Sequence, residues 1–223
     1  MSRFLPFDIL YEDRDLIVID KPAGLLTTHT KLQGRAARTA QPTAENFLND
    51  YVRKGQARSS KRVYLVHRLD RETSGVMMFM KDERLAEAVR DRWNELTEKI
   101  YLARVEGRLS ETRGVFESWL LEDADGYRVR SVKGPHGAGP RKPKLARTEW
   151  RRLSVASATT RVEIALKSGR KNQIRVHFSE AGHPVVGDVK YGAKKADRLH
   201  LRSVRLVFTH PLTGRKFDFR ADP

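Results

Sequence analysis

The sequence contains no cysteine among its 223 residues, which excludes disulfide bonds and thiolate metal sites. No apolar run approaches the roughly 20 residues that a membrane-spanning helix needs, and the N-terminal residues lack the apolar stretch of a secretion signal. The seven histidines form no HxxxH pair, and no G-x-G-x-x-G, Walker or G-x-S-x-G pattern occurs. We therefore expect a cytoplasmic protein without a membrane segment, a metal site, a nucleotide cofactor or a serine-hydrolase centre.

Acidic residues are scarce beside basic ones, at 28 against 44, which gives a formal net charge of +16. The excess is concentrated: residues 128–152 hold nine basic residues and one acid, and residues 52–71 hold seven and one, whereas residues 82–98 are acidic. A field of this size favours a polyanionic partner, although a basic surface that only keeps the protein soluble is an alternative. The uneven distribution indicates a surface that binds phosphate.

Hydrophobic periodicity predicts an α+β fold with a largely antiparallel mixed β-sheet and flanking helices and loops. A helix is expected behind a Thr43 cap as far as Val52, and an amphipathic helix over residues 82–98. Residues 54–62 and 133–144 are expected to be loops. Strands are expected at residues 16–19, 65–66, 76–80, 101–106, 115–121, 127–132, 148–153, 161–166, 204–208 and 216–219. With no repeat and no linker, the sequence predicts a single domain over residues 1–223.

One segment, residues 173–178, fits two structures. It alternates as a strand does, which would place Gln173, Arg175 and His177 on one face. Ile174 and Phe178 also fit helical spacing, and the Gly-His-Pro sequence at residues 182–184 is typical of a helix end. We predict a helix of about ten residues that starts near residues 168–172.

The most reactive arrangement in the sequence is the polar turn at residues 67–75, HRLDRETSG, between two apolar strands. The carboxylate of Asp70 lies among basic side chains, on a loop between two predicted strands. It could therefore act as a nucleophile or a general base. Turn aspartates are also common as acceptors of backbone hydrogen bonds, and a local salt bridge to Arg68 or Arg71 is the other structural alternative.

Several blocks of this sequence, in order, resemble the motifs of the RluA-type pseudouridine synthases. Residues 67–75 resemble the H-R-L-D-x-x-T-S-G signature, and residues 15–25 (DLIVIDKPAGL) resemble the opening strand with its K-P-x-G-L turn. Residues 99–103 (KIYLA) resemble the K-x-Y-x-A segment. Residues 168–177 (SGRKNQIRVH) and 182–192 (GHPVVGDVKYG) resemble the two later motifs. The blocks cover the chain nearly end to end, and the resemblance implies a pseudouridine synthase fold.

The resemblance also implies roles for particular residues. Asp70 would be the catalytic carboxylate, Tyr101 would stack on the target base, and Arg175 would pair with the Asp70 carboxylate. Arg68 would help to displace the target nucleotide. Without the resemblance, Tyr101 could equally be a core strand residue and Arg175 a structural ion pair.

The implied reaction isomerises uridine in RNA to pseudouridine. It needs no cofactor, because the bond from ribose C1′ to uracil N1 is broken and remade to C5 without net oxidation or reduction. The substrate would be a stem-loop of ribosomal or transfer RNA, since a looped uridine is the easiest to flip. Its phosphates are expected to meet the basic segment 128–152, notably Arg141, Lys142, Lys144 and Arg147. Asn172 departs from the histidine frequent in the family.

The chain is expected to be a monomer of the single-domain branch, without the S4 RNA-binding module. Two other functions stay open from the sequence. A catalytically silent RNA-binding protein or RNA chaperone would use the same fold and charge. A glycoside or nucleoside hydrolase would need a second carboxylate across the site.

Overall fold

The computed structural model describes residues 5–29, 41–54, 56, 58–124, 126–136 and 141–222. The chain divides into two compact units. The first unit is Met1–Thr97 with Ser203–Asp222, and the second is Glu98–Arg202. The single domain expected over residues 1–223 stays a prediction. Within the described residues, no helix has both the length and the apolar character needed to cross a bilayer.

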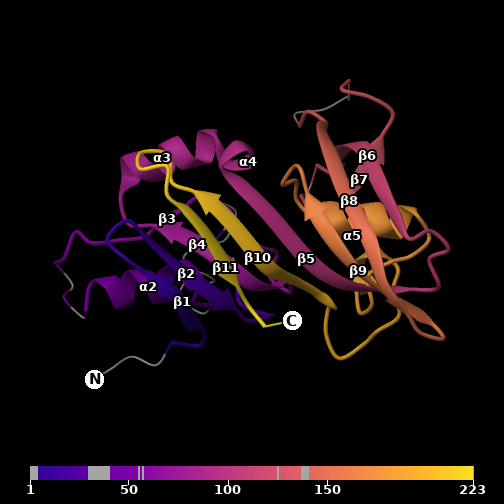
Figure 1. The fold of residues 1–223 in the computed structure, drawn as a ribbon, viewed down its shortest axis with the longest axis horizontal. Helices are drawn as coiled ribbons and strands as arrows, with labels where there is room; N and C mark the ends of the chain where they lie inside the picture. Colours follow the sequence, from indigo (N-terminus) through magenta and orange to yellow (C-terminus); the bar gives the residue numbers. More distant parts are fainter. Residues whose placement is uncertain are drawn as a thin grey trace. The chain divides into compact units, whose positions relative to one another are not determined.

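The first unit is a sheet with strands in the order β1-β2-β4-β10, with β11 paired to β10 and β3 to β4. Figure 1 shows the C-terminal strands β10 and β11, in yellow, alongside strands from the start of the chain. The strands and helices of this unit are β1 Asp8–Glu12, β2 Leu16–Lys21, α2 Ala44–Val52, β3 Tyr64–Leu65, β4 Ser74–Met80, α3 Glu83–Asp91, α4 Trp93–Leu96, β10 Leu201–Thr209 (from Ser203 onward) and β11 Lys216–Arg220.

Strands β2 and β4 pair antiparallel at the centre of this sheet and are apolar on both faces. On one face, Val18 and Met78 pack with Leu85 of α3 and Phe208 of β10 in one buried cluster. The alternate residues of the same two strands are fully buried as well. A strand buried on both faces is continuously apolar, which is why both segments could be predicted from sequence.

Glycine is required at position 75, where the polar turn enters β4. Gly75 has φ +111°, and a Cβ built there would lie 2.0 Å from the carbonyl oxygen of Ser203. The close approach of another strand explains the glycine that ends the T-S-G sequence.

The second unit is an antiparallel sheet in the order β5-β9-β8-β6-β7, with helix α5 packed against it (Figure 1). Phe178 of α5 contacts Phe116 of β6 edge-on and Trp150 of β8 at a tilt. The strands and helices of this unit are β5 Thr97–Glu106 (from Glu98), β6 Arg113–Glu122, β7 Val129–Val132, β8 Lys144–Val155, β9 Thr159–Leu166, α5 Gln173–Glu180 and the short 3-10 helix η1 Val189–Tyr191.

The expected α+β fold with a mostly antiparallel sheet is confirmed, as are the expected strands. The helix predicted for residues 173–178 is also confirmed: α5 starts after Asn172 and ends before Gly182, which has φ +79°. Gly182 takes the left-handed conformation that commonly ends a helix. The helix prediction depended on this glycine, because alternation alone favours a strand equally.

The single helix predicted over residues 82–98 is wrong. Arg92 leaves helical geometry (φ −112°, ψ 17°) and divides the segment into α3 and α4, and β5 already begins at Thr97. Trp93 stacks on the His67 ring with centroids 4.5 Å apart, and the Thr97 hydroxyl donates to the Trp93 carbonyl at 2.6 Å. These contacts hold Trp93 against a residue distant in sequence, so helical periodicity could not predict the break.

Two short elements were not expected, β1 and η1. Only alternate residues of β1 turn inward, and charged residues stand at both its ends, so its apolar signal is weak. The loop expected at residues 133–144 ends where β8 begins at Lys144, and its residues 137–140 lie outside the described part of the chain.

Candidate functional site

The turn that carries Asp70 is fixed to the first unit through its backbone. The carbonyl of Asp70 accepts a hydrogen bond from the Thr73 amide at 3.1 Å. The carbonyl of Leu69 accepts from the Thr27 hydroxyl at 2.9 Å, and both threonines are buried. Because its neighbours are anchored, the half-buried Asp70 side chain projects from a backbone with little freedom to move.

Lys21 is the main buried support of this turn. It is fully buried, although lysine is almost never buried without partners. Its ammonium donates to the carbonyls of Pro22 at 2.9 Å, Leu25 at 2.8 Å and Arg71 at 3.0 Å. Burial lowers the pKa of Lys21 to about 8, and the negative charges of Glu72 and Asp70 partly offset this effect by raising it. The Asp70 carboxylate therefore lies within the electrostatic reach of a buried ammonium group.

Arg71 ties the same two segments together a second time. Its carbonyl accepts from the Gly24 amide at 2.9 Å, and its Nε donates to the Gly24 carbonyl at 3.0 Å. The K-P-A-G-L turn and the Asp70 turn are thus one hydrogen-bonded assembly. Arg68, for which the resemblance implies displacement of the target nucleotide, is exposed; its role stays a prediction.

In the second unit, Tyr101 lies in β5 opposite Ile164 of β9 and is 8% exposed. Tyr101, Ala103 and Val105 are buried while residues between them are not, so the expected alternation along this strand is confirmed. The tyrosine ring is therefore held by the sheet, with a small part of its surface accessible.

Arg175 lies on α5 in the second unit and forms a two-point ion pair with Asp188. Its Nε donates to Asp188 Oδ2 and its Nη2 to Oδ1, each at 2.7 Å. Both side chains are buried, and the guanidinium carbon lies 5.1 Å from the centre of the Tyr191 ring. A bidentate pair of this kind fixes the plane of the guanidinium as well as its position.

Asp188 is a functional candidate that the sequence analysis missed. It falls inside the G-H-P-V-V-G-D motif, so the signal was present, but a carboxylate in a motif does not reveal its partner. Asp70 belongs to the first unit, and Tyr101 and Arg175 belong to the second. That the three act together, with Arg175 paired to Asp70, stays a prediction.

Polar contacts also position helix α5 on its sheet. His177 Nδ1 lies 2.8 Å from the Thr148 hydroxyl of β8, and its Nε2 lies 3.0 Å from the Ser118 hydroxyl of β6. Gln173 donates from its amide nitrogen to the same Thr148 hydroxyl at 2.9 Å. Burial lowers the pKa of His177 to about 4, so at neutral pH the ring is uncharged and serves as a structural link.

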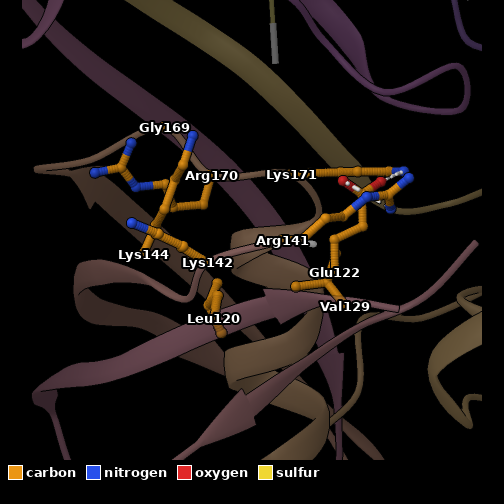
Figure 2. Close-up of a pocket in the computed structure, with 9 residues that line it drawn as sticks. All are labelled: Leu120, Glu122, Val129, Arg141, Lys142, Lys144, Gly169, Arg170 and Lys171. Carbon is orange, nitrogen blue, oxygen red and sulfur yellow. Dashed lines mark hydrogen bonds and ion pairs between the residues drawn. The ribbon is translucent and has the colours of Figure 1, made fainter. Parts of the chain in front are cut away.

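The second unit also contains a basic cavity of about 340 Å³. Figure 2 shows Arg170, Lys142 and Lys144 on one side of it and a group of Glu122, Arg141 and Lys171 on the other. Glu122 pairs with both Arg141 and Lys171. Leu120, Val129 and Gly169 complete the lining. The sequence predicted three of the five cations, Arg141, Lys142 and Lys144, and missed Arg170 and Lys171.

Arg147, the fourth predicted RNA contact, is not among the residues that line this cavity. Its guanidinium pairs with Glu117 and Glu149, each at 3.2 Å. Arg151 of the same basic segment pairs with Glu163 at 2.6 Å. Part of the positive charge of residues 128–152 is therefore already paired with acidic side chains on the protein surface.

Within the described residues, no three His, Asp or Glu side chains are grouped as metal ligands. The expected absence of a metal and of a cofactor stays a prediction.

Comparisons with known proteins agree on one family. The family model described as RNA pseudouridylate synthase matches residues 15–180. "tRNA pseudouridine synthase C" of Haemophilus ducreyi is 32% identical over 97% of this chain and 91% of its own length. "Dual-specificity RNA pseudouridine synthase RluA" of Yersinia pestis is 31% identical over 96% and 98%. The solved structure titled "Human RNA Pseudouridylate Synthase Domain Containing 4" has a TM-score of 0.73 and 24% identity, and covers 96% of this chain and 87% of its own. That likeness shows the fold.

Proposed function

Since the chain belongs to the RNA pseudouridylate synthase family, we propose that Asp70 is the carboxylate with which it isomerises uridine in RNA to pseudouridine. The observation that carries the assignment is the anchoring of the Asp70 turn, at Leu69, at the Asp70 carbonyl and through the buried Lys21. A catalytic group must be held in a narrow range of positions, and this turn meets that need.

The reaction breaks the bond from ribose C1′ to uracil N1 and forms a bond from C1′ to C5 of the same base; C5 loses a proton and N1 gains one, so substrate and product are isomers. No electrons are gained or lost. The protein must supply a group that engages the nucleoside while the base turns, and an ionised carboxylate can do so as a nucleophile or as a base.

Tyr101 and Arg175 are proposed to complete the site. The Tyr101 ring offers a flat face for the uracil, and such stacking is worth roughly 1–3 kcal/mol. Arg175 is proposed to pair with the Asp70 carboxylate. The Asp188 contact supports this role, because its two hydrogen bonds to Nε and Nη2 fix the plane and position of the guanidinium.

The substrate is proposed to be a stem-loop of ribosomal or transfer RNA. The uridine must leave its stack, which costs a few kcal/mol and least in a loop. Arg68 would take part in displacing the nucleotide. Arg141, Lys142, Lys144 and Arg147 would hold phosphates, and the basic cavity supports this for the first three. Relatives carry names for transfer RNA and for dual specificity, which is consistent with either class of RNA. We further propose a cytoplasmic monomer acting as one catalytic domain.

The test replaces Asp70 by Asn and measures pseudouridine in RNA treated with the purified protein, together with RNA affinity. We expect isomerisation to be abolished and affinity to stay within a few-fold. Glu72→Gln is the matched control, because Glu72 lies in the same turn, carries the same charge and is exposed. Isomerisation by the Asp70→Asn protein at the wild-type rate would overturn the assignment.

The same assay separates the competing functions. A silent RNA-binding protein would give no pseudouridine with the wild-type chain, on transfer RNA or on ribosomal RNA from cells that lack the protein. A hydrolase would release free uracil instead of converting it. Quantitative nucleoside analysis of the products distinguishes all three results.

A further inference from the structure

A second basic cavity, of about 630 Å³, lies in the first unit. The turn after β1, the C-terminal end of α2 and the residues before β3 form its walls, and none of its lining residues belongs to the Asp70 turn. Its lining residues are Glu12, Arg14, Tyr51, Val52, Lys54, Lys61, Arg62 and Lys81. Five of these eight are basic and one is acidic, so the cavity is strongly positive.

The one acid in the lining does not oppose an anion. Glu12 accepts a hydrogen bond from the Tyr51 hydroxyl at 2.9 Å through Oε2 and pairs with Lys81 through Oε1. Lys81 is fixed further by the Asp13 carbonyl, to which it donates at 2.6 Å. The negative charge of Glu12 is therefore neutralised inside the wall.

Unlike Lys81, three other basic residues of the lining are not paired with an acid within the part of the chain that the structure describes. They are Arg14, Lys61 and Arg62. The backbone that carries Lys61 is nevertheless ordered, because Arg53 Nε donates to the Lys61 carbonyl at 3.1 Å. The next segment is held where the Val63 amide donates to the Asn49 side chain at 2.8 Å. Cations without acid partners on a fixed wall are suited to binding an anion.

Lys54 occupies an unusual backbone position just past the end of α2. Its φ of +50° lies in the left-handed region, where glycine costs less than any residue with a side chain. A lysine at this position directs a charged side chain to the cavity wall at some cost in backbone energy. The left-handed conformation commonly ends a helix, and here it places the Lys54 charge in the lining of the cavity.

The aromatic residue in the lining points to a nucleic acid among anionic ligands. Tyr51 is 40% exposed while its hydroxyl donates a hydrogen bond to Glu12. An exposed aromatic residue among cations offers a stacking face for a base beside contacts for phosphate.

We propose that this cavity is a second RNA-binding site, which holds the sugar-phosphate backbone of the substrate away from the uridine that reacts, with Tyr51 against a base. The inference rests on the proposed function, since it assumes an RNA substrate. The simpler alternative is that Lys54, Lys61 and Arg62 are solvated surface charges that only complement the negative end of α2.

The test measures how tightly the protein binds a mixed pool of transfer RNA at several salt concentrations. All variants also carry Asp70→Asn, so that turnover does not interfere with the binding measurement. Each phosphate contact contributes about 0.7–0.9 to the slope of the logarithm of the binding constant against the logarithm of the salt concentration, here called the salt slope. The Lys61→Gln/Arg62→Gln double variant should lower the slope by about 1.5 and weaken binding about tenfold or more near physiological salt. Arg84→Gln/Lys216→Gln is the matched control, because it removes two exposed charges of the same unit outside the cavity.

Equal slopes for the cavity variant and the control variant would overturn the proposal, since the effect would then come from overall charge. A slope unchanged from the Asp70→Asn background would overturn it as well. Thermal unfolding of both double variants identifies any loss of folding. Because pseudouridine formation by the wild-type chain is measured separately, failure of this site and failure of the proposed function give different results.

Tyr51 supplies an independent readout. Tyr51→Phe keeps the ring and loses the hydroxyl contact to Glu12, whereas Tyr51→Ser loses the ring. We expect binding close to that of the parent for the phenylalanine variant and about tenfold weaker binding for the serine variant. Equal binding by both variants would contradict the stacking part of the proposal.

Discussion

The Arg175 guanidinium is held by Asp188 through two hydrogen bonds of 2.7 Å, and both side chains are buried in the second unit. The two residues lie in different sequence motifs, one on α5 and the other just before η1. The arginine implied in catalysis therefore has a fixed orientation that is set by a residue with no implied role of its own.

Replacing Asp188 by Asn should destabilise the protein by about 3 kcal/mol, because it removes the charge of a buried two-point ion pair with Arg175. Chemical denaturation measures this change. The control is Asp218→Asn, which breaks the bidentate pair with Arg205 on the surface and should cost less than about 1 kcal/mol. Comparable losses in the two variants would mean that the buried pair is no more important than an exposed one.

The buried Lys21 makes stability depend on alkaline pH. Its pKa in the folded protein, about 8, is lower than its ordinary value of 10.5, so between these values the unfolded chain binds more protons. The free energy of unfolding should therefore rise with pH in this window, by at most about 1.4 kcal/mol per pH unit. Relative to Lys21→Met, the wild type should gain stability from pH 7 to pH 10. Lys216→Met, which replaces an exposed lysine, is the control. The difference in unfolding free energy between the wild type and this variant should not change with pH.

His177 should make stability depend on acidic pH. Burial places its folded pKa at about 4, below its ordinary 6.5, so the unfolded state takes up the proton first as pH falls. Stability should decline from pH 6.5 toward pH 4, and His177→Gln should flatten that part of the profile. His136→Gln, at an exposed histidine, should leave the profile unchanged. Urea titrations at several pH values measure both effects.

The cations of the basic cavity in the second unit should differ in importance for RNA. Lys142→Ala/Lys144→Ala should weaken RNA binding several-fold more than Arg147→Ala, because Arg147 is already paired with Glu117 and Glu149 and must break those contacts first. Turnover at saturating RNA should change little in either variant. Binding measured at two salt concentrations checks the order, and a larger effect from Arg147 would contradict it.

Residues close together in sequence determined much of this protein by themselves. Runs of apolar residues identified β2 and β4, the Thr43 cap identified the start of α2, and the carboxylate between two apolar strands identified the Asp70 turn. Each of these features depends on interactions within a few residues or on burial of a whole strand, which a linear pattern records. The sequence also indicated the scale of the positive charge.

Only the tertiary structure decided which partners the charged residues have. In the folded protein Lys21 donates to the Arg71 carbonyl, fifty positions away, and Arg175 pairs with Asp188. Arg147 pairs with Glu117 of β6 and Glu149 of β8. The tertiary structure also interrupted the helix at Arg92, where Trp93 stacks on His67. The physical reason is that the energy of a buried charge or ring depends on the groups around it in space, and the folded chain brings those groups from distant positions.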